Sequence, residues 1–361
     1  MNIAFYVDEM NLRGVANSTY QFAYQNKKIL KNRSIIFYNK KNYRNNVNVI
    51  KKFKKNFKVF GISYFKEIDN YKDKFLIDYL YVQKSGNIDN WVSNKIKTLV
   101  HGVYPQKINQ VHGYRFAYIS EWLSKNFSNY KIPFVPLITE VSKSKENLRK
   151  KLKIRKDKFV LGCYGGESSF DLKFAQYAIK TAVKKRKDIT FIFLNIKKFC
   201  NHNQVKFLKG TTNENFKKKF INSCDAMIYG RSLGESFGLS CGEFAIENKK
   251  IISYKFNRHR SHSYNIPASH FIEYNSYNSL VKIFLNLKKN SSNCRNKYKE
   301  YSNRKIIKVF QKAFLKENTI KEITLNDTLK NLFSFLMMGY RYLRYKLYEH
   351  YFNFFEIKFI R

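Results

Sequence analysis

The chain has 361 residues, which exceeds the ~250–300 residues at which a single hydrophobic core stops growing, so two domains are expected. Hydrophobic residues make up 44% and aromatic residues 17% of the sequence, which excludes a disordered, collagen-like or low-complexity protein. Lys and Arg number 69 against 26 Asp and Glu, a formal net charge of +43. This surplus favours a polyanionic partner such as nucleic acid, anionic lipid or a phosphorylated substrate. The alternative is the bias of an AT-rich genome, because Lys, Asn, Tyr, Phe and Ile are abundant along the whole chain.

In the first part of the chain, short apolar segments alternate with an amphipathic one. Residues 3–7 form an apolar run typical of a buried parallel strand, and a loop and a helix over 15–30 follow. With the next strand at 34–38 this makes a βαβ unit, which implies a parallel sheet covered on both faces. Further strands are expected at 58–62, 75–82, 97–100 and 116–119.

The pattern restarts after a charged segment that covers residues 140–158. Strands are expected at 159–164, 189–194, 205–208, 225–229 and 250–254, and helices at 172–185, 214–223 and 237–248. We therefore expect an α/β protein with two Rossmann-like parallel sheets facing each other across a cleft. The expected division is a first domain at 1–140, a linker at 141–157, a second domain at 158–300 and C-terminal helices at 301–361.

The C-terminal region is helical, basic and aromatic. Helices are expected at 280–288, 304–316 and 328–355, and the last one interleaves Phe, Tyr, Leu and Met with Arg and Lys. It is too interrupted by charge to span a bilayer. Two arrangements stay open: the segment 332–361 lies on an anionic membrane surface, or it crosses back and packs on the first domain.

Cysteine usage and the N-terminal residues indicate a cytoplasmic protein. The chain has no C-x-x-C pair, so neither a zinc site nor a disulfide framework is expected. The first ten residues lack the basic and apolar regions of a signal peptide. The five cysteines are far apart and fit a reducing compartment: Cys163, Cys200, Cys224, Cys241 and Cys294.

The segment from Arg231 to Phe244 carries the most specific chemistry, because it sits where a strand gives way to a helix. Gly234 and Gly238 permit tight turning and close approach of the backbone to a ligand. A helix that begins near Phe237 would present free N–H groups and the positive end of its dipole, which suits a phosphate. Glu235 and Glu243, eight residues apart, are too distant to share one proton and could hold two ends of an extended ligand.

The stretch Glu-Ser-Phe-Gly-Leu-Ser-Cys-Gly-Glu from Glu235 to Glu243 resembles the E-x7-E signature of GT-B glycosyltransferases, in particular the retaining family 4 or group 1 enzymes. The direct resemblance covers about 25 residues, and two α/β domains with C-terminal helices agree with it. It implies that the first domain binds the acceptor and the second the nucleotide-sugar. It also implies that Glu243 holds the ribose hydroxyls, that Glu235 acts at the donor sugar, and that backbone N–H groups of Phe237, Gly238 and Leu239 lie against the diphosphate or sugar.

The sequence departs from the family where a diphosphate-binding Arg and Lys follow the first strand of the second domain. The Arg is missing there, and Lys173 is a candidate replacement for the Lys. Arg231 is a natural replacement because a guanidinium can clamp phosphate oxygens, and the turn at Gly166 could bring backbone N–H groups close. In the first domain, Gly14 alone represents the glycine-rich loop that family members place over the donor phosphate.

Three histidines are candidates because they follow predicted strands or turns. Related enzymes place a first-domain histidine beside the donor sugar, and His101 fits that position better than His112. His262 follows the strand at 250–254. For each of them the alternative is a structural histidine that is hydrogen-bonded inside the fold.

No D-x-D pair and no Walker P-loop occur in the chain. D-x-D pairs hold a divalent cation in metal-dependent glycosyltransferases, so no metal and no separate cofactor are expected. The absence of a P-loop disfavours an ATPase of that class.

The sequence therefore predicts a hexosyltransferase-like enzyme of glycan biosynthesis, class EC 2.4. It would move a sugar from a nucleotide-sugar to a glycan, lipid-linked or protein acceptor, with retention and without metal. Two alternatives stay open: a catalytically degenerate GT-B protein, and a basic nucleic-acid-binding protein on an α/β scaffold, for which no recognisable nucleic-acid module is present.

Overall fold

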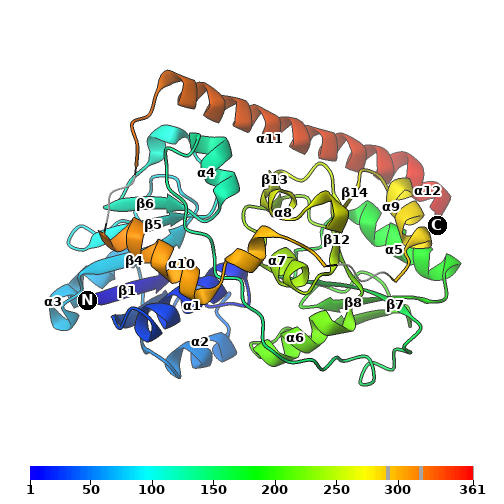
Figure 1. Cartoon of the computed structure of the whole chain (residues 1–361), viewed down its shortest axis with the longest axis horizontal. Coiled ribbons are helices and arrows are strands. Elements are labelled where there is room, and N and C mark those ends of the chain that lie inside the picture. The colour runs from blue at the N-terminus through cyan, green and yellow to red at the C-terminus, as the bar shows by residue number, and fades with distance from the viewer. Residues whose placement is uncertain (290–292, 317–319, 361) are drawn as a thin grey trace. The chain divides into compact units, whose positions relative to one another are not determined.

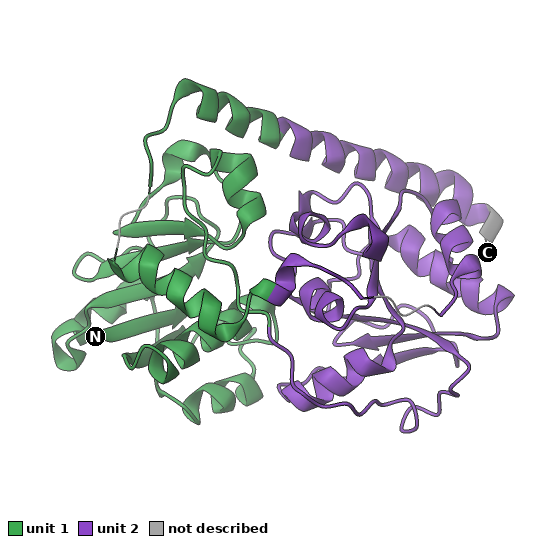
Figure 2. Cartoon of the chain, in the orientation of Figure 1, with its two compact units in different colours: residues 1–139, 300–335 green, residues 140–299, 336–361 purple. Residues whose placement is uncertain are grey.

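The computed structural model describes residues 1–289, 293–316 and 320–360, which fall into two compact units. Unit 1 comprises residues 1–139 and 300–335, and unit 2 comprises residues 140–299 and 336–361 (Figure 2). Each unit contains a six-stranded parallel sheet with helices packed on it (Figure 1). Of the predicted C-terminal segment, Arg361 lies outside the described residues.

The sheet of unit 1 has the strand order β3-β2-β1-β4-β5-β6, and every pairing is parallel. Its central strands are buried along nearly their whole length, which explains why they read as continuous apolar runs. The strands are β1 (Asn2–Val7), β2 (Arg33–Asn39), β3 (Lys58–Ile62), β4 (Tyr79–Lys84), β5 (Lys97–Gly102) and β6 (Arg115–Tyr118).

Helices cover both faces of this sheet, and one of them comes from far along the sequence. The Phe22 ring in the first helix stacks on Phe310, and Phe310 also contacts Tyr81 of β4, so the segment after residue 300 completes the core of unit 1. On the other face Tyr6 packs edge-on against Phe65. The helices are α1 (Gly14–Lys28), α2 (Val47–Lys54), α3 (Lys72–Phe75), α4 (Glu121–Ser128) and α10 (Asn303–Phe310), with 3₁₀ helices at Phe65–Tyr71 and Ile108–Gln110 and a π-helix at Gln311–Lys316.

The sheet of unit 2 has the order β14-β12-β10-β7-β8-β9. Read from the β9 edge, this is the same doubly wound order as in unit 1, with β7 in the place of β1 and β10 in the place of β4. The strands are β7 (Phe159–Tyr164), β8 (Ile189–Leu194), β9 (Val205–Leu208), β10 (Ala226–Tyr229), β12 (Lys250–Tyr254) and β14 (Phe271–Tyr274), and the short pair β11 (Gly234–Glu235) and β13 (His259–Arg260) lies apart from them.

The helices of unit 2 also divide between two faces of its sheet. Phe174 of α5 packs on Tyr254 and Tyr274, whereas Phe220 of α6 meets Phe244 of α7 on the other face. The helices are α5 (Lys173–Lys185), α6 (Glu214–Ser223), α7 (Leu239–Ile246), α8 (Ser261–Asn265), α9 (Tyr277–Asn286) and α12 (Ile357–Ile360), with 3₁₀ helices at Ala268–His270 and Lys297–Glu300 and a π-helix at Phe352–Glu356.

Helix α11 (Leu325–Tyr351) contributes residues to both units. Up to residue 335 it belongs to unit 1, where Asn331 donates to the carbonyl oxygens of Gln106 and Phe127. From residue 336 it belongs to unit 2, where the Tyr348 ring packs on Phe174. Among the residues described, no helix combines the length and apolar character needed to cross a membrane.

Most predicted strands match the structure to within one or two residues, but three predictions need correction. The strand expected at 75–82 begins only at Tyr79, because Leu76 is left-handed and ends α3. The helix expected from Phe237 begins at Leu239, since Gly238 before it has a φ of 90°. Helices α2 and α4 were not predicted.

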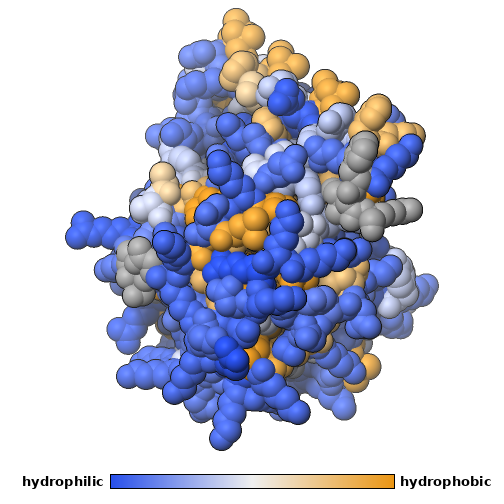
Figure 3. Space-filling view, turned by 90° about the vertical axis from the view of Figure 1, so that its right-hand side faces the viewer, coloured by the Kyte–Doolittle hydropathy of each residue, from blue (hydrophilic) through white to orange (hydrophobic). Residues whose placement is uncertain are grey.

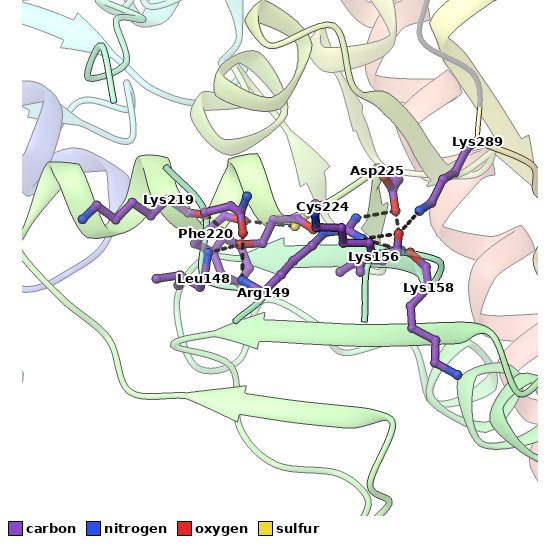
Figure 4. A network of polar contacts seen from close by, with 12 residues as sticks. Leu148, Arg149, Lys156, Lys158, Lys219, Phe220, Cys224, Asp225 and Lys289 are labelled. Atoms are coloured by element: carbon purple, nitrogen blue, oxygen red, sulfur yellow. Dashed lines mark hydrogen bonds and ion pairs between the residues drawn. The ribbon is translucent and has the colours of Figure 1, made fainter. Parts of the chain in front are cut away.

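Arg149 fixes the segment that leads into unit 2 (Figure 4). Its guanidinium donates to the carbonyl oxygens of Ser223 and Lys158, at 3.0 Å each, and to the Asp225 carboxylate at 2.7 Å. The same carboxylate accepts the backbone N–H of Val160 in β7. One half-buried side chain thus joins the incoming segment to the end of α6 and to the starts of β7 and β10.

We predict that Arg149→Met lowers the free energy of unfolding by about 2 kcal/mol, because it removes charge-assisted hydrogen bonds and leaves Asp225 without its cation. Arg155→Met is the matched control, since Arg155 pairs with Asp157 at the exposed surface and its loss should leave the free energy of unfolding nearly unchanged. Urea denaturation of both variants measures the difference. Equal midpoints would contradict the role given to Arg149.

Candidate functional site

The candidate site lies at the carboxyl ends of β7 and β10 in unit 2. These neighbouring strands mark the point where the strand order reverses, because β8 and β9 extend the sheet on one side and β12 and β14 on the other. Ligands of doubly wound sheets bind at this switch point. The last residues of the two strands are Tyr164 and Tyr229, and each contacts one glutamate of the E-x7-E stretch.

Glu243 is buried on α7, with 4% of the residue exposed. The Lys217 ammonium donates to its Oε1 at 3.0 Å, and the Tyr164 hydroxyl donates to its Oε2. Lys217 also pairs with Glu214 at 2.7 Å, one turn earlier on α6. Three elements, β7, α6 and α7, therefore meet at one carboxylate.

The electrostatics of this cluster keep its members in defined protonation states. Burial raises the pKa of Glu243, and the Lys217 ammonium opposes that rise. Burial lowers the pKa of Lys217, but the carboxylates of Glu243 and Glu214 outweigh it and leave that pKa raised. Burial and the Glu243 charge raise the pKa of Tyr164, so its hydroxyl stays protonated and donates. The Lys217 ammonium thus lies between two carboxyl groups, and the Tyr164 hydroxyl is a neutral donor to one of them.

Glu235 lies in β11 and is partly exposed, with 21% of its side chain accessible. β11 pairs with β13 through Gly234↔His259 and Glu235↔Arg260. The Tyr229 hydroxyl donates to the Glu235 carboxylate at 2.6 Å, and the Arg231 guanidinium lies 3.4 Å from the same oxygen. Glu235 lies in strand β11 and Glu243 lies in helix α7, so the two glutamates do not belong to one helix.

Two glycines shape the backbone between the glutamates. Gly234 has a φ of 70°, and an added Cβ would lie 2.1 Å from the His259 carbonyl oxygen. Gly238 has a φ of 90°, and an added Cβ would lie 2.9 Å from the Tyr298 hydroxyl. Leu239 is the first residue of α7, while Phe237 is buried and its carbonyl accepts from Tyr298 at 2.5 Å. Only glycine fits both positions without strain.

The loops around the site are tied to one another. The Asp171 carboxylate accepts the backbone N–H and hydroxyl of Ser232, at 2.7 and 2.8 Å, which joins the loop after β7 to the loop after β10. Asn257 donates to the Arg231 carbonyl oxygen at 2.6 Å. Gly166 is half-buried with its carbonyl bonded to the Ser169 N–H, and Lys173 is exposed at the start of α5. The donor-side residues predicted in the second domain thus all lie in unit 2, whereas Gly14 lies in unit 1.

His262 is buried, with 1% of the residue exposed, and it contacts Asn257, which holds the loop after β10. Its Nε2 lies 3.0 Å from Ser253 Oγ and 3.2 Å from Asn257 Oδ1, and its Nδ1 has no hydrogen-bond partner in the described part of the chain. Burial lowers the pKa of His262 to about 3, so the ring is neutral. Its contacts are those of a side chain that supports the loop and the neighbouring Gly238.

The three candidates from the first domain lie in unit 1. His101 is completely buried: its Nδ1 lies 2.6 Å from the Tyr81 hydroxyl and its Nε2 2.8 Å from the Val135 carbonyl oxygen. Burial lowers its pKa to about 3, which leaves the ring neutral within the core. The expectation of a catalytic His101 is corrected, because the side chain faces the interior of unit 1 and both ring nitrogens are used.

The other two unit 1 candidates differ in exposure. His112 lies 2.7 Å from the Lys84 ammonium through Nε2 and 2.7 Å from the Gln110 carbonyl oxygen through Nδ1. Gly14 is exposed as the first residue of α1.

Sequence reasoning missed the partners that hold the two glutamates: Tyr164, Tyr229, Lys217 and Glu214. The sequence could have indicated the two tyrosines, because each is the last residue of an apolar run that forms a strand at the switch point. Nothing in the sequence distinguishes Lys217, because it is one of three consecutive lysines on α6. Only the structure shows that this lysine contacts Glu243. Within residues 1–289, 293–316 and 320–360, no group of three or more His, Cys, Asp or Glu side chains could hold a metal ion.

Comparisons with known proteins reveal similarity in structure rather than in sequence. No family model matches the chain, and no curated protein matches it. Three solved structures illustrate the structural similarity. A glycosyltransferase from Rickettsia africae ESF-5 is 14% identical, with a TM-score of 0.56 over 94% of this chain and 98% of that chain. Alr3699/HepE from Anabaena, in complex with UDP and glucose, is 10% identical, with a TM-score of 0.59 over 94% and 99%.

The third structure has a different activity in its name. A putative UDP-N-acetylglucosamine 2-epimerase from Listeria monocytogenes is 10% identical, with a TM-score of 0.55 over 90% of this chain and 99% of that chain. At such identities the similarity concerns the fold alone. Together with the two doubly wound sheets and the C-terminal helices, it establishes that the chain has the GT-B fold.

Proposed function

We propose that this protein is a glycosyltransferase that uses a nucleotide-sugar as donor. The observation that carries the proposal is the position of Glu235 and Glu243 at the switch point of the unit 2 sheet. Both carboxylates are held by the tyrosines that end its two central strands. HepE, which shares the fold, has been crystallised with UDP and glucose and with UDP-glucose, which supports a nucleotide-sugar as the ligand here.

In this proposal Glu243 binds the ribose. An ionised carboxylate can accept about four hydrogen bonds, and the described contacts of Glu243 are one from Lys217 and one from Tyr164. Because the carboxylate is buried, we infer that ribose hydroxyls reach it by displacing the Tyr164 hydroxyl, while Lys217 keeps the charge balanced. The Tyr164 contact then competes with the nucleotide.

Glu235 and Arg231 act next to the transferred sugar and the diphosphate. Glu235 is the more exposed glutamate and would accept hydrogen bonds from sugar hydroxyls. Negative charge that develops on the departing diphosphate would be stabilised by Arg231, Lys173 and the N–H groups at the start of α7. For Arg231 this requires a shift from its present position 3.4 Å from Glu235.

The finer features of the reaction follow from the resemblance to the family 4 enzymes and are part of the proposal. They are retention of the anomeric configuration, independence of divalent metal, a cytoplasmic location and a glycan, lipid-linked or protein acceptor.

Thermal unfolding of the purified protein with UDP-, GDP-, ADP- and CDP-sugars, with and without Mg²⁺, tests the donor class. A ligand that binds the native state raises the midpoint according to its concentration relative to Kd. We expect one nucleotide class to raise it without metal. Product analysis then distinguishes transfer from epimerisation, the activity in the name of the Listeria protein. No shift with any sugar nucleotide would contradict the proposed function.

We predict that Glu243→Gln weakens donor binding by about tenfold or more, because charge-assisted hydrogen bonds to the ribose contribute roughly 1.5–3 kcal/mol. Tyr164→Phe should bind the donor at least as tightly as the unmodified protein, since it removes a competing hydroxyl. Isothermal titration calorimetry measures both. Glu247→Gln is the control: Glu247 caps the same helix and pairs with Lys218, and its loss should leave donor affinity unchanged.

We also predict that Gly238→Ala reduces both stability and donor affinity. The alanine would have a left-handed backbone and a Cβ against Tyr298 and His262, a strain of about 1–2 kcal/mol or more. Gly339→Ala in α11 is the matched control, because an added Cβ there meets nothing within 4 Å and should stabilise the helix by up to about 1 kcal/mol. If Gly238→Ala keeps full affinity and the same melting temperature, the backbone at this position is not part of the site.

A further inference from the structure

Helix α11 has one face that packs on the protein and a second that does not. On the packed face, Asp327, Asn331 and Ser334 form hydrogen bonds to unit 1. Farther along, Tyr345 and Phe352 pack against aromatic rings of unit 2. These contacts account for the attachment of the helix and use only about half of its circumference.

The opposite face is apolar along the whole helix. Its members recur at spacings of three or four residues, with one adjacent pair, so they share one face at about 3.6 residues per turn. Each is between 48% and 76% exposed. From first to last they extend about 39 Å at a rise of 1.5 Å per residue. This outer stripe consists of Leu325, Leu329, Leu332, Phe333, Leu336, Tyr340, Leu343, Leu347 and Tyr351.

Apolar side chains gather at the top of the space-filling view, over the place where α11 runs in Figure 1 (Figure 3). Scattered apolar residues are ordinary on a protein surface, but an ordered stripe of this length marks an interaction site.

The charges beside the outer stripe are basic. No charged residue belongs to the stripe itself, and Lys330, Arg344 and Lys346 are exposed along its edges. The acidic residues between 325 and 358 have positions away from it or other contacts. Asp327 is buried and bonded to Thr324, Glu349 lies 3.8 Å from the ammonium of Lys346, and Glu356 accepts from Tyr348.

Two occupants could cover such a stripe, and the charges decide between them. A second copy of this helix would bring basic edges against basic edges, because the acidic residues of the segment already have partners within the chain. A bilayer with anionic headgroups would take up the leucines and Phe333 at the acyl boundary and place Tyr340 and Tyr351 at the interface. The flanking Lys and Arg would then meet the headgroups, each with a favourable contribution of about 1 kcal/mol.

We propose that the outer stripe of α11 is a docking surface for an anionic lipid bilayer, on which the helix lies in the plane of the interface. The proposal uses none of the residues of the candidate donor site and does not depend on the proposed function. Of the two arrangements that the sequence left open, packing on the first domain holds for α11 only up to residue 335, and residues 336–361 belong to unit 2. The proposal takes up the other arrangement, with the outer face on a membrane.

Vesicle flotation of the full-length protein tests this surface. We expect binding to vesicles of phosphatidylcholine with phosphatidylglycerol, and at least tenfold weaker binding to phosphatidylcholine alone or at high salt. The triple variant L336E/L343E/L347E should lose at least tenfold in affinity for the anionic vesicles. All three side chains are exposed, so folding should be unaffected, which circular dichroism and the melting temperature verify.

The matched control is V47E/Y64E/I88E, which changes the net charge equally at three apolar side chains that are as exposed but lie elsewhere. It should bind anionic vesicles like the unmodified protein. Equal loss in both triple variants would show that net charge alone drives binding and would overturn the proposal. So would the absence of vesicle binding, or a dimer in sedimentation that L336E/L343E/L347E converts to monomers.

Discussion

A buried carboxylate is the constraint around which unit 2 is organised. An isolated charge with as little exposure as Glu243 would cost several kcal/mol, and the ion pair with Lys217 and the hydrogen bond from Tyr164 offset that cost. Because the three residues come from α7, α6 and β7, satisfying the charge also fixes these elements against one another. The end of the central strand, the start of the loop after it and the second turn of α7 are thereby held in one place. In the proposed function, the Lys217 pair holds Glu243 in place while the ribose hydroxyls take over the position of the Tyr164 hydroxyl.

The fold was largely readable from the sequence because both sheets are parallel and covered on both faces. Strands such as β7 and β8 are then continuous apolar runs, and their bounds could be assigned to the residue. The E-x7-E stretch was located by its spacing and context. The sequence did not reveal the side chains that contact the two glutamates, because some of these contacts join residues far apart along the chain. Tyr164 meets Glu243 from 79 residues away, and nothing local distinguishes Lys217 from its neighbours.

Local backbone conformation and side-chain direction explain the remaining errors. The start of α7 was misplaced because Gly238, left-handed in the structure, interrupts a stretch that otherwise has helical periodicity. His101 follows an apolar strand, as predicted, but in a sheet covered on both faces either direction of a side chain leads into a core. The C-terminal helix was recognised as basic and aromatic, whereas the division of its apolar residues between a packed face and the outer stripe required the structure.

The central claim is that a nucleotide-sugar binds at the switch point of unit 2. Hydrogen–deuterium exchange of the full-length protein, with and without saturating UDP-glucose or whichever sugar nucleotide raises the melting temperature most, tests it directly. Slower exchange concentrated in residues 164–172 and 231–246 is the result that this account predicts, since these segments contain the end of β7, Glu235, Gly238 and Glu243. Unchanged exchange in both segments, with protection elsewhere in the chain, would contradict it.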